Sequence, residues 1–269
     1  MTPDIRSLYK PVQPTVSQAS ADSVSYTEIM PAETLQPYIY CYWLLQTNQI
    51  LDAPFVYRVV ADGCIDIYFE LSNPLDSWVM GFCKKYTEFP LAQSFKYVGV
   101  RFLPAMFPQL FGINASELSN KYTALADVLP KVAVFIADRF YGAATINEVK
   151  AVFDSYFISI LDTSAAPDNR FYDALGLILH HHGMVNVETS LDMGISPRQL
   201  RRLFDHYVGT SAKTFSQVVR FQNILQAKPS VQSLRQNKLF FDAGYYDQSH
   251  FIKEFKTFYG VTPSHAFGR

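Results

Sequence analysis

The chain has 269 residues, enough for two domains of ordinary size, and 49% of them are hydrophobic, which excludes extensive disorder. No apolar run approaches the ~20 residues that cross a bilayer, and residues 1–20 lack the basic-then-apolar order of a signal peptide. We therefore expect a cytoplasmic protein without membrane contact. The net charge of −1 conceals a split: residues 1–169 hold 11 Lys and Arg against 17 Asp and Glu, whereas residues 170–269 hold 12 against 7. This asymmetry favours a polyanion-binding module attached to an acidic partner domain.

The sequence predicts four segments. Residues 1–24 hold three prolines among Ser, Gln and Thr, without a sustained apolar period, and should form a flexible N-terminal arm. Residues 25–161 should form a β-rich sensing or dimerisation domain that ends in helices. Residues 162–169 are small and polar, contain a proline and lie where the charge balance changes sign, so they are the predicted linker. Residues 170–269 carry helical patterns throughout.

Short segments rich in β-branched and aromatic residues dominate the first half, and turn signals such as Asp-Gly at 62–63 separate them. In one segment Ile65, Ile67 and Phe69 occupy alternate positions, which is the period of a sheet with one buried face. Over 145–161 the apolar spacing changes to three and four residues. This spacing predicts one long amphipathic helix.

Residues that favour helix ends delimit the helices of the second half. Glycine stops two of them, at Gly183 and Gly260. The expected N-caps are Asp168 or Asn169, Ser196 ahead of Pro197 at the first helical position, Ser211 and Asp247. The second half should therefore be a set of short helices with tight turns.

The helix that starts at Pro197, after a turn at Gly194, has an apolar face and a basic face. A helix, a glycine turn and a helix with a basic outer face form the helix-turn-helix pattern, whose second helix enters the major groove of DNA. A short amphipathic hairpin with a solvated arginine face would give the same local pattern. The apolar residues are Leu200, Leu203 and Phe204, and the basic residues are Arg198, Arg201 and Arg202.

A second unit of the same kind argues for the helix-turn-helix interpretation. Residues 234–241 predict its supporting helix, and Phe251 and Phe255 face the core from the helix that follows. An unrelated sequence would rarely show two such units joined by one helix by chance. The outward-facing polar residues of the last helix include Gln248, Ser249 and Lys253.

Residues 243–264, AGYYDQSHFIKEFKTFYGVTPS, closely resemble the signature of AraC/XylS-type transcription regulators, and the resemblance extends upstream through 194–204, GISPRQLRRLF. It covers about residues 171–267 and implies about seven helices, with two recognition helices that read successive major-groove segments. Two features depart from the pattern, a polar stretch at 186–191 and Phe240 in place of a small residue. The resemblance assigns DNA contacts to Arg198, Arg201, Arg202, Gln248, Ser249 and Lys253.

Segments at 37–43, 61–67 and 99–104 resemble a less characterised N-terminal domain found in one branch of these regulators. This resemblance implies a cupin-like barrel followed by dimerising helices. The predicted fold class is therefore α+β in two domains, a mainly-β cupin-like barrel and an all-α double helix-turn-helix. The barrel mouth is the default ligand site. Candidate lining residues are Trp43, Tyr57, Arg58 and Arg101, and the alternative is that they are core aromatics and surface arginines.

Catalytic and metal chemistry find little support in the sequence. A metal-binding cupin needs converging histidines, and residues 1–169 contain none. Consecutive residues on a helix point about 100° apart, so His180–His182 are interpreted as a cationic helix C-terminus. No nucleophile-base-acid set or phosphate loop is present, so we predict neither an enzyme nor a cofactor. The cysteines Cys41, Cys64 and Cys83 fit buried hydrophobes, with a redox sensor or an alkyl acceptor at Cys64 as the alternative.

The predicted function is sequence-specific transcription regulation, with an N-terminal domain that senses a small molecule or mediates dimerisation. One alternative is an N-terminal domain that binds a protein partner, and another is a cupin-like enzyme fused to a DNA-binding domain. The expected partners are double-stranded DNA, a small-molecule effector, a second copy of the chain and, for an activator, RNA polymerase.

Overall fold

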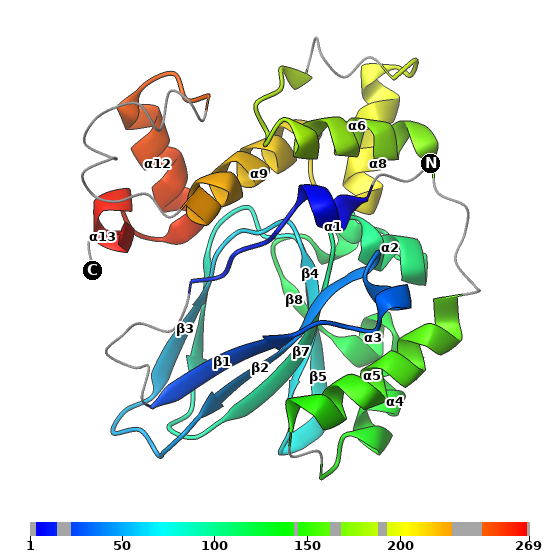
Figure 1. Ribbon diagram of the computed structural model, residues 1–269, viewed down its shortest axis with the longest axis vertical. Coiled ribbons are helices and arrows are strands. Elements are labelled where there is room, and N and C mark those ends of the chain that lie inside the picture. The colour runs from blue at the N-terminus through cyan, green and yellow to red at the C-terminus, as the bar shows by residue number, and fades with distance from the viewer. Residues whose placement is uncertain are drawn as a thin grey trace.

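The computed structural model describes residues 4–14, 23–142, 145–161, 168–187, 193–227 and 244–267. It confirms the predicted fold class, a mainly-β N-terminal domain followed by a helical C-terminal domain. Figure 1 shows the strands in the lower part of the molecule, helices α4 and α5 along one side, and the C-terminal helices across the upper end of the strands. In the part of the chain that is described, no helix is long and apolar enough to cross a membrane.

Two antiparallel sheets build the N-terminal domain. The larger has the order β1-β2-β7-β4-β5-β8, and the smaller pairs β3 with β6. The strands are β1 (Val24–Ile29), β2 (Ile39–Thr47), β3 (Phe55–Val59), β4 (Ile65–Glu70), β5 (Asn73–Met80), β6 (Thr87–Leu91), β7 (Lys96–Phe102) and β8 (Tyr122–Ala124). The helical elements of this domain are η2 (Glu33–Leu35), α2 (Met106–Phe111), η3 (Ala115–Leu118), α3 (Leu125–Val128), α4 (Pro130–Arg139) and α5 (Ile146–Ile160).

The alternation seen in the sequence of β4 decides which face of the large sheet meets the helices. Ile67 and Phe69 are fully buried in the core that the sheet shares with α4 and α5. The Phe69 ring lies 5.0 Å from that of Phe140 and 6.2 Å from that of Phe153 on α5. The opposite face of the strand, which carries Tyr68, is turned toward the small sheet. Both faces of the large sheet are therefore covered.

The predicted helix over 145–161 is confirmed as α5, with a complete capping box at its start. The Thr145 side chain accepts a hydrogen bond from the Glu148 amide, and the Glu148 carboxylate accepts one from the Thr145 amide. These reciprocal bonds satisfy two of the amides that every helix N-terminus leaves free.

Five described helices form the C-terminal domain, and the predicted caps hold them. The side chain of Asp168, rather than that of Asn169, caps the first helix, and the side chains of Ser196, Ser211 and Asp247 cap three others as predicted. The helices are α6 (Asn169–His180), α8 (Pro197–Tyr207), α9 (Ala212–Ala227), α12 (Gln248–Tyr259) and α13 (Pro263–Phe267). The predicted supporting helix at 234–241, most of the polar stretch at 186–191, Phe240 and most of the linker lie outside the described residues.

Residues 4–14 of the predicted arm pack against the rest of the chain. Asp4 caps the short helix α1 (Ile5–Leu8), and Ile5 and Tyr9 are each only 3% exposed. Both side chains belong to one apolar core that also holds residues of the barrel and of the C-terminal helices. The arm is held because it supplies apolar surface at the junction of the two domains.

Candidate functional site

Helix α8, the predicted first recognition helix, presents a basic face to solvent. Its apolar side chains Leu200 and Phe204 are buried against the domain core. The facing predicted from the sequence is therefore the facing observed. The exposed side chains include all three predicted DNA-contacting arginines, Arg198, Arg201 and Arg202.

Helix α12, the predicted second recognition helix, exposes polar side chains in its first two turns. Phe251 and Phe255 are buried on its inner face. Figure 1 places α8 and α12 toward opposite ends of α9, which connects the two units. The exposed residues include the predicted Gln248, Ser249 and Lys253.

A buried ion pair that the sequence did not reveal fixes α12 against α9. Arg220 Nη2 donates to both oxygens of Glu254, at 3.0 and 3.2 Å, and Nη1 donates to the Gly244 carbonyl at 3.1 Å. The guanidinium also lies 4.2 Å from the centre of the Tyr245 ring. Gln217 donates a further hydrogen bond to Glu254. These contacts set the angle at which the second helix is presented.

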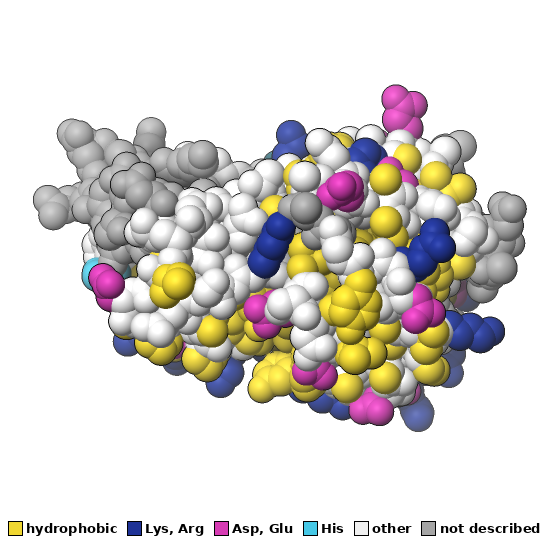
Figure 2. All heavy atoms as spheres, turned by 90° about the horizontal axis from the view of Figure 1, so that it is seen from below, with side chains coloured by type: hydrophobic (Ala, Val, Ile, Leu, Met, Phe, Trp, Pro, Cys, Tyr) yellow, Lys and Arg dark blue, Asp and Glu magenta, His cyan; other side chains and the backbone are white. Residues whose placement is uncertain are grey.

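The opposite end of the molecule has a different surface. Figure 2 views the strands from the end away from the C-terminal helices and shows acidic and basic side chains interspersed with hydrophobic ones. On α8, by contrast, three arginines lie within five consecutive positions. Adjacent cations of this kind suit a polyanion better than a surface of mixed charge does.

A cavity of about 290 Å³ lies between the two sheets of the N-terminal domain. The predicted residues Trp43, Tyr57 and Arg101 line it, but Arg58 does not. Neighbouring residues of a strand point to opposite faces, so β3 cannot turn both Tyr57 and Arg58 inward. Arg58 instead pairs with Glu88 at 2.7 Å, where both side chains are solvent-accessible.

The sequence missed most of the cavity wall. Its remaining lining residues are Leu45, Val59, Val60, Ala61, Asp62, Cys64, Asp66, Tyr68, Trp78, Met80, Gly81, Cys83, Phe89, Pro90, Leu91, Tyr97 and Tyr122.

A glycine positions the indole of Trp43 in the wall. Trp43 on β2 pairs with Gly99 on β7, and a Cβ added at Gly99 would lie 2.3 Å from two indole carbons. The ring therefore lies directly over the glycine. Its Nε1 donates to Asp66 Oδ2 at 3.0 Å. Only a residue without a side chain at position 99 allows this placement.

One guanidinium and several carboxylates form the polar end of the cavity. Arg101, only 3% exposed, lies 3.0 Å from Asp66, 3.4 Å from Asp62 and 3.6 Å from Glu28. Burial raises the pKa of Asp66 to about 6, although Arg101 opposes the shift. Burial alone would lower the pKa of Arg101, but Asp66, Tyr26 and Asp62 outweigh it, so the guanidinium stays charged.

The two cysteines in the wall are poorly suited to redox chemistry. Burial raises the pKa of the Cys64 thiol well above its usual range. Burial also raises the pKa of Cys83 to about 11. Because the thiolate is the reactive form, both side chains are held in the unreactive state near neutral pH.

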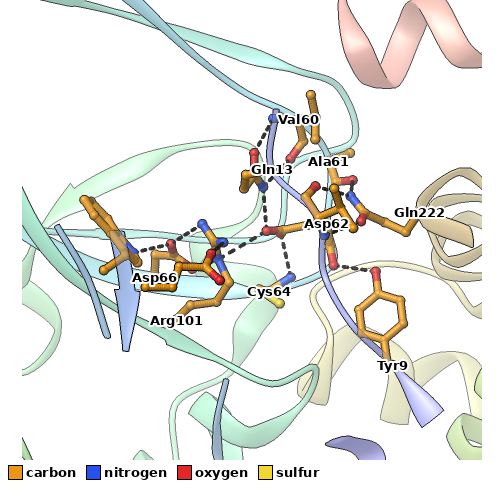
Figure 3. Close-up of polar contacts among 12 residues, drawn as sticks. Tyr9, Gln13, Val60, Ala61, Asp62, Cys64, Asp66, Arg101 and Gln222 are labelled. Carbon is orange, nitrogen blue, oxygen red and sulfur yellow. Dashed lines mark hydrogen bonds and ion pairs between the residues drawn. The ribbon is translucent and has the colours of Figure 1, made fainter. Parts of the chain in front are cut away.

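Asp62 joins the cavity to the arm (Figure 3). Its Oδ2 accepts a hydrogen bond from Gln13 Nε2 at 2.7 Å, and its backbone carbonyl accepts one from Tyr9 Oη at 2.7 Å. The arm in turn bonds to α9, because Gln222 accepts from the Val12 amide at 2.7 Å. The same glutamine donates to the Ala61 carbonyl, beside Asp62, at 2.8 Å. Cavity wall, arm and C-terminal helices thus share one hydrogen-bond network.

Two loops of the cavity wall also contact helix α12. In the β3–β4 loop, the Ala61 amide donates to the Phe258 carbonyl of α12 at 3.3 Å. The β5–β6 loop contributes Cys83 to the cavity, and its Tyr86 amide donates to the Thr257 carbonyl at 3.2 Å. The C-terminal end of α12 is therefore fastened to the parts of the barrel that enclose the cavity.

Residues 190–269 match the family described as helix-turn-helix domain, and residues 27–124 match a domain of unknown function, DUF6597. No curated protein sequence matches the chain. Among solved structures, ToxT from Vibrio cholerae is 13% identical with a TM-score of 0.39, over 91% of this chain and 96% of that chain. ToxT bound to (E)-4-(8-methylnaphthalen-1-yl)but-3-enoic acid is 11% identical with a TM-score of 0.41, over 91% and 98%.

Proposed function

We propose that this chain, whose residues 190–269 match a helix-turn-helix domain, is a sequence-specific transcription regulator of the AraC type whose N-terminal domain senses a small molecule. The observation that carries the sensing role is the position of Asp62. This residue belongs at once to the cavity wall and to the hydrogen-bond network that reaches α9. A ligand in the cavity therefore contacts the structure that holds the DNA-binding helices.

The exposed faces of α8 and α12 supply the DNA contacts in this proposal. Two recognition helices about 34 Å apart would enter neighbouring major-groove segments on one side of the duplex. Base-edge contacts are assigned to Arg198, Arg201 and Gln248, because arginine and glutamine form bidentate bonds with guanine and adenine. Phosphate contacts are assigned to Arg202, Ser249 and Lys253.

Binding-site selection from a random duplex pool, followed by footprinting, tests the proposal. We expect one preferred sequence and protection of two neighbouring major-groove segments. Arg198→Ala or Gln248→Ala should relax preference at particular base pairs by about 1 to 3 kcal/mol. Lys253→Ala should weaken binding to all sequences alike. Lys131→Ala, an exposed lysine on α4, is the matched control and should change neither property.

Two results would contradict the proposal. Selection that yields no preferred sequence would remove sequence-specific regulation. Protection of a single groove segment, together with unchanged preference in Gln248→Ala, would show that α12 does not read bases. Dimerisation and contact with RNA polymerase remain predictions that gel filtration with DNA and polymerase-recruitment assays can test.

A further inference from the structure

We propose that the cavity between the two sheets binds an organic cation, an amine or quaternary ammonium group carried on an apolar or aromatic body. This inference rests on the proposed sensing function of the same domain and names the chemical class of its effector. The inference rests on two features of the cavity wall: its aromatic side chains and its excess of carboxylates over cations.

Seven of the residues that line the cavity are aromatic, and each comes from a different strand. Four of them form a row of successive ring contacts. The centres of the Tyr68 and Phe89 rings lie 6.1 Å apart, those of Phe89 and Tyr122 5.9 Å, and those of Tyr122 and Trp78 5.7 Å. The faces of such rings are electron-rich, and cages of them bind ammonium groups. The aromatic lining residues are Trp43, Tyr57, Tyr68, Trp78, Phe89, Tyr97 and Tyr122.

The charges at the polar end of the cavity exclude an anion. Among the described residues that line the cavity, Arg101 is the one cation, and Asp62 and Asp66 both line the cavity beside it. A carboxylate ligand would have to approach two carboxylates to reach one guanidinium that they already hold. An organic cation instead neutralises the excess negative charge and keeps its body against the rings.

One feature of Arg101 taken alone would favour an anion. Its Nη1 is buried and makes no hydrogen bond. The Glu28 carboxylate, however, lies 3.6 Å from this nitrogen and supplies further negative charge on that side. With Asp62 and Asp66, the guanidinium therefore faces three carboxylates, and the local excess of negative charge remains.

The two tryptophans of the chain provide a direct assay, because both Trp43 and Trp78 line the cavity. Their fluorescence can be titrated in the full chain with three probes of similar shape: benzyltrimethylammonium, its neutral isostere 2,2-dimethylpropylbenzene, and the anion 3-phenylpropanoate. We expect the cation to bind about tenfold more tightly than the neutral isostere, and the anion to bind least.

Two variants and one control separate the charge from the shape of the site. Asp62→Asn and Asp66→Asn should each lower affinity for the cation by about tenfold and leave affinity for the neutral isostere unchanged. Asp76→Asn, an exposed aspartate on β5 outside the cavity, should bind all three probes as the unmodified chain does.

A pH titration of the unmodified chain tests the inference even where a variant fails to fold. Protonation of Asp66, whose pKa burial raises to about 6, removes a negative charge, so cation affinity should fall as the pH drops from 7 to 5. The neutral isostere should show no such fall. Arg101 and Asp62 face this carboxyl group, as do Cys41, Cys64, Tyr57, Tyr68 and Cys83, whose raised pKa values keep them neutral in this range.

The remaining outcomes separate a failure of this inference from a failure of the proposed function. Equal or tighter binding of the neutral isostere or the anion refutes the cationic class and leaves a sensing cavity. Absence of binding by all three probes, in a chain that still selects a DNA sequence, refutes the cation site and the sensing role but not DNA recognition. Failure of DNA selection with intact cation binding refutes the regulator and leaves the cation site standing.

Discussion

Replacement of Gln222 by leucine should separate the arm and the barrel from α9. The side chain is completely buried and makes three hydrogen bonds. It accepts from the Val12 amide at 2.7 Å and donates to the Val12 carbonyl at 3.2 Å and to the Ala61 carbonyl at 2.8 Å. Leucine has a similar volume but leaves all three backbone groups without a partner.

The expected loss of unfolding free energy follows from the three backbone groups that lose their hydrogen-bond partner. An unsatisfied buried donor or acceptor costs about 1 to 3 kcal/mol. Val12 is only half-buried, so water can reach its groups and the lower figure applies to them. The sum is about 3 kcal/mol, which for a protein of this size lowers the melting temperature by roughly 6 °C or more.

Gln226→Leu is the matched control. Gln226 lies one helical turn further along α9 and also donates to the arm, at the Lys10 carbonyl, but it is exposed. Its replacement should cost less than about 0.5 kcal/mol. Differential scanning calorimetry gives the melting temperatures, and hydrogen exchange of the Val12 amide reports the local bond. Equal melting of the two variants, or an amide that stays protected in Gln222→Leu, would refute the reasoning.

Three further predictions concern the buried pair, the indole and the DNA. Glu254→Gln leaves the partly buried Arg220 without its counter-ion and should cost about 3 kcal/mol in urea unfolding, and a loss below 1 kcal/mol would contradict this. Gly99→Ala must displace the Trp43 indole, so in a Trp78→Phe background the emission should shift to longer wavelength, and an unchanged spectrum would show that the ring tolerates a methyl group. Affinity for duplex DNA should fall steeply as salt rises, because phosphate contacts release counterions, and a salt-independent affinity would exclude an electrostatic interface.

Rules that involve only neighbouring residues in the sequence were sufficient to predict where helices begin and which face of a strand is buried. Ser196 with Pro197 and Asp247 lie where capping chemistry placed them, because a cap depends only on residues within one turn. The alternation in β4 also identified its core face. These features require no knowledge of distant parts of the chain.

The missed features depend on residues far apart in sequence. Gln222 and Glu254 are polar residues on amphipathic helices, and such residues usually face solvent. Their burial follows from partners 210 and 34 positions away, at Val12 and Arg220. No periodicity reports such a pairing.

The error at Arg58 could have been avoided. Tyr57 and Arg58 are consecutive in a strand, so only one of the two side chains points to the inner face of the sheet. The choice between them needed the second sheet, in which β3 pairs with β6 and Arg58 lies opposite Glu88. The sequence alone shows that the two side chains point to opposite faces of the strand. It does not show which of these faces is the inner one.

The residues that make the cavity polar also hold the domain junction together. Asp62 uses one carboxylate oxygen for the Cys64 amide and the other for Gln13, with Arg101 beside it. A ligand group that attracts Asp62 must weaken one of these contacts. Because each buried polar group costs about 1 to 3 kcal/mol when left unpaired, the bonded and released arrangements are separate states rather than a continuum. In the proposed sensing function, a ligand that binds one of them more tightly would shift the population toward it, and the bond from the arm to Gln222 would carry that difference to α9.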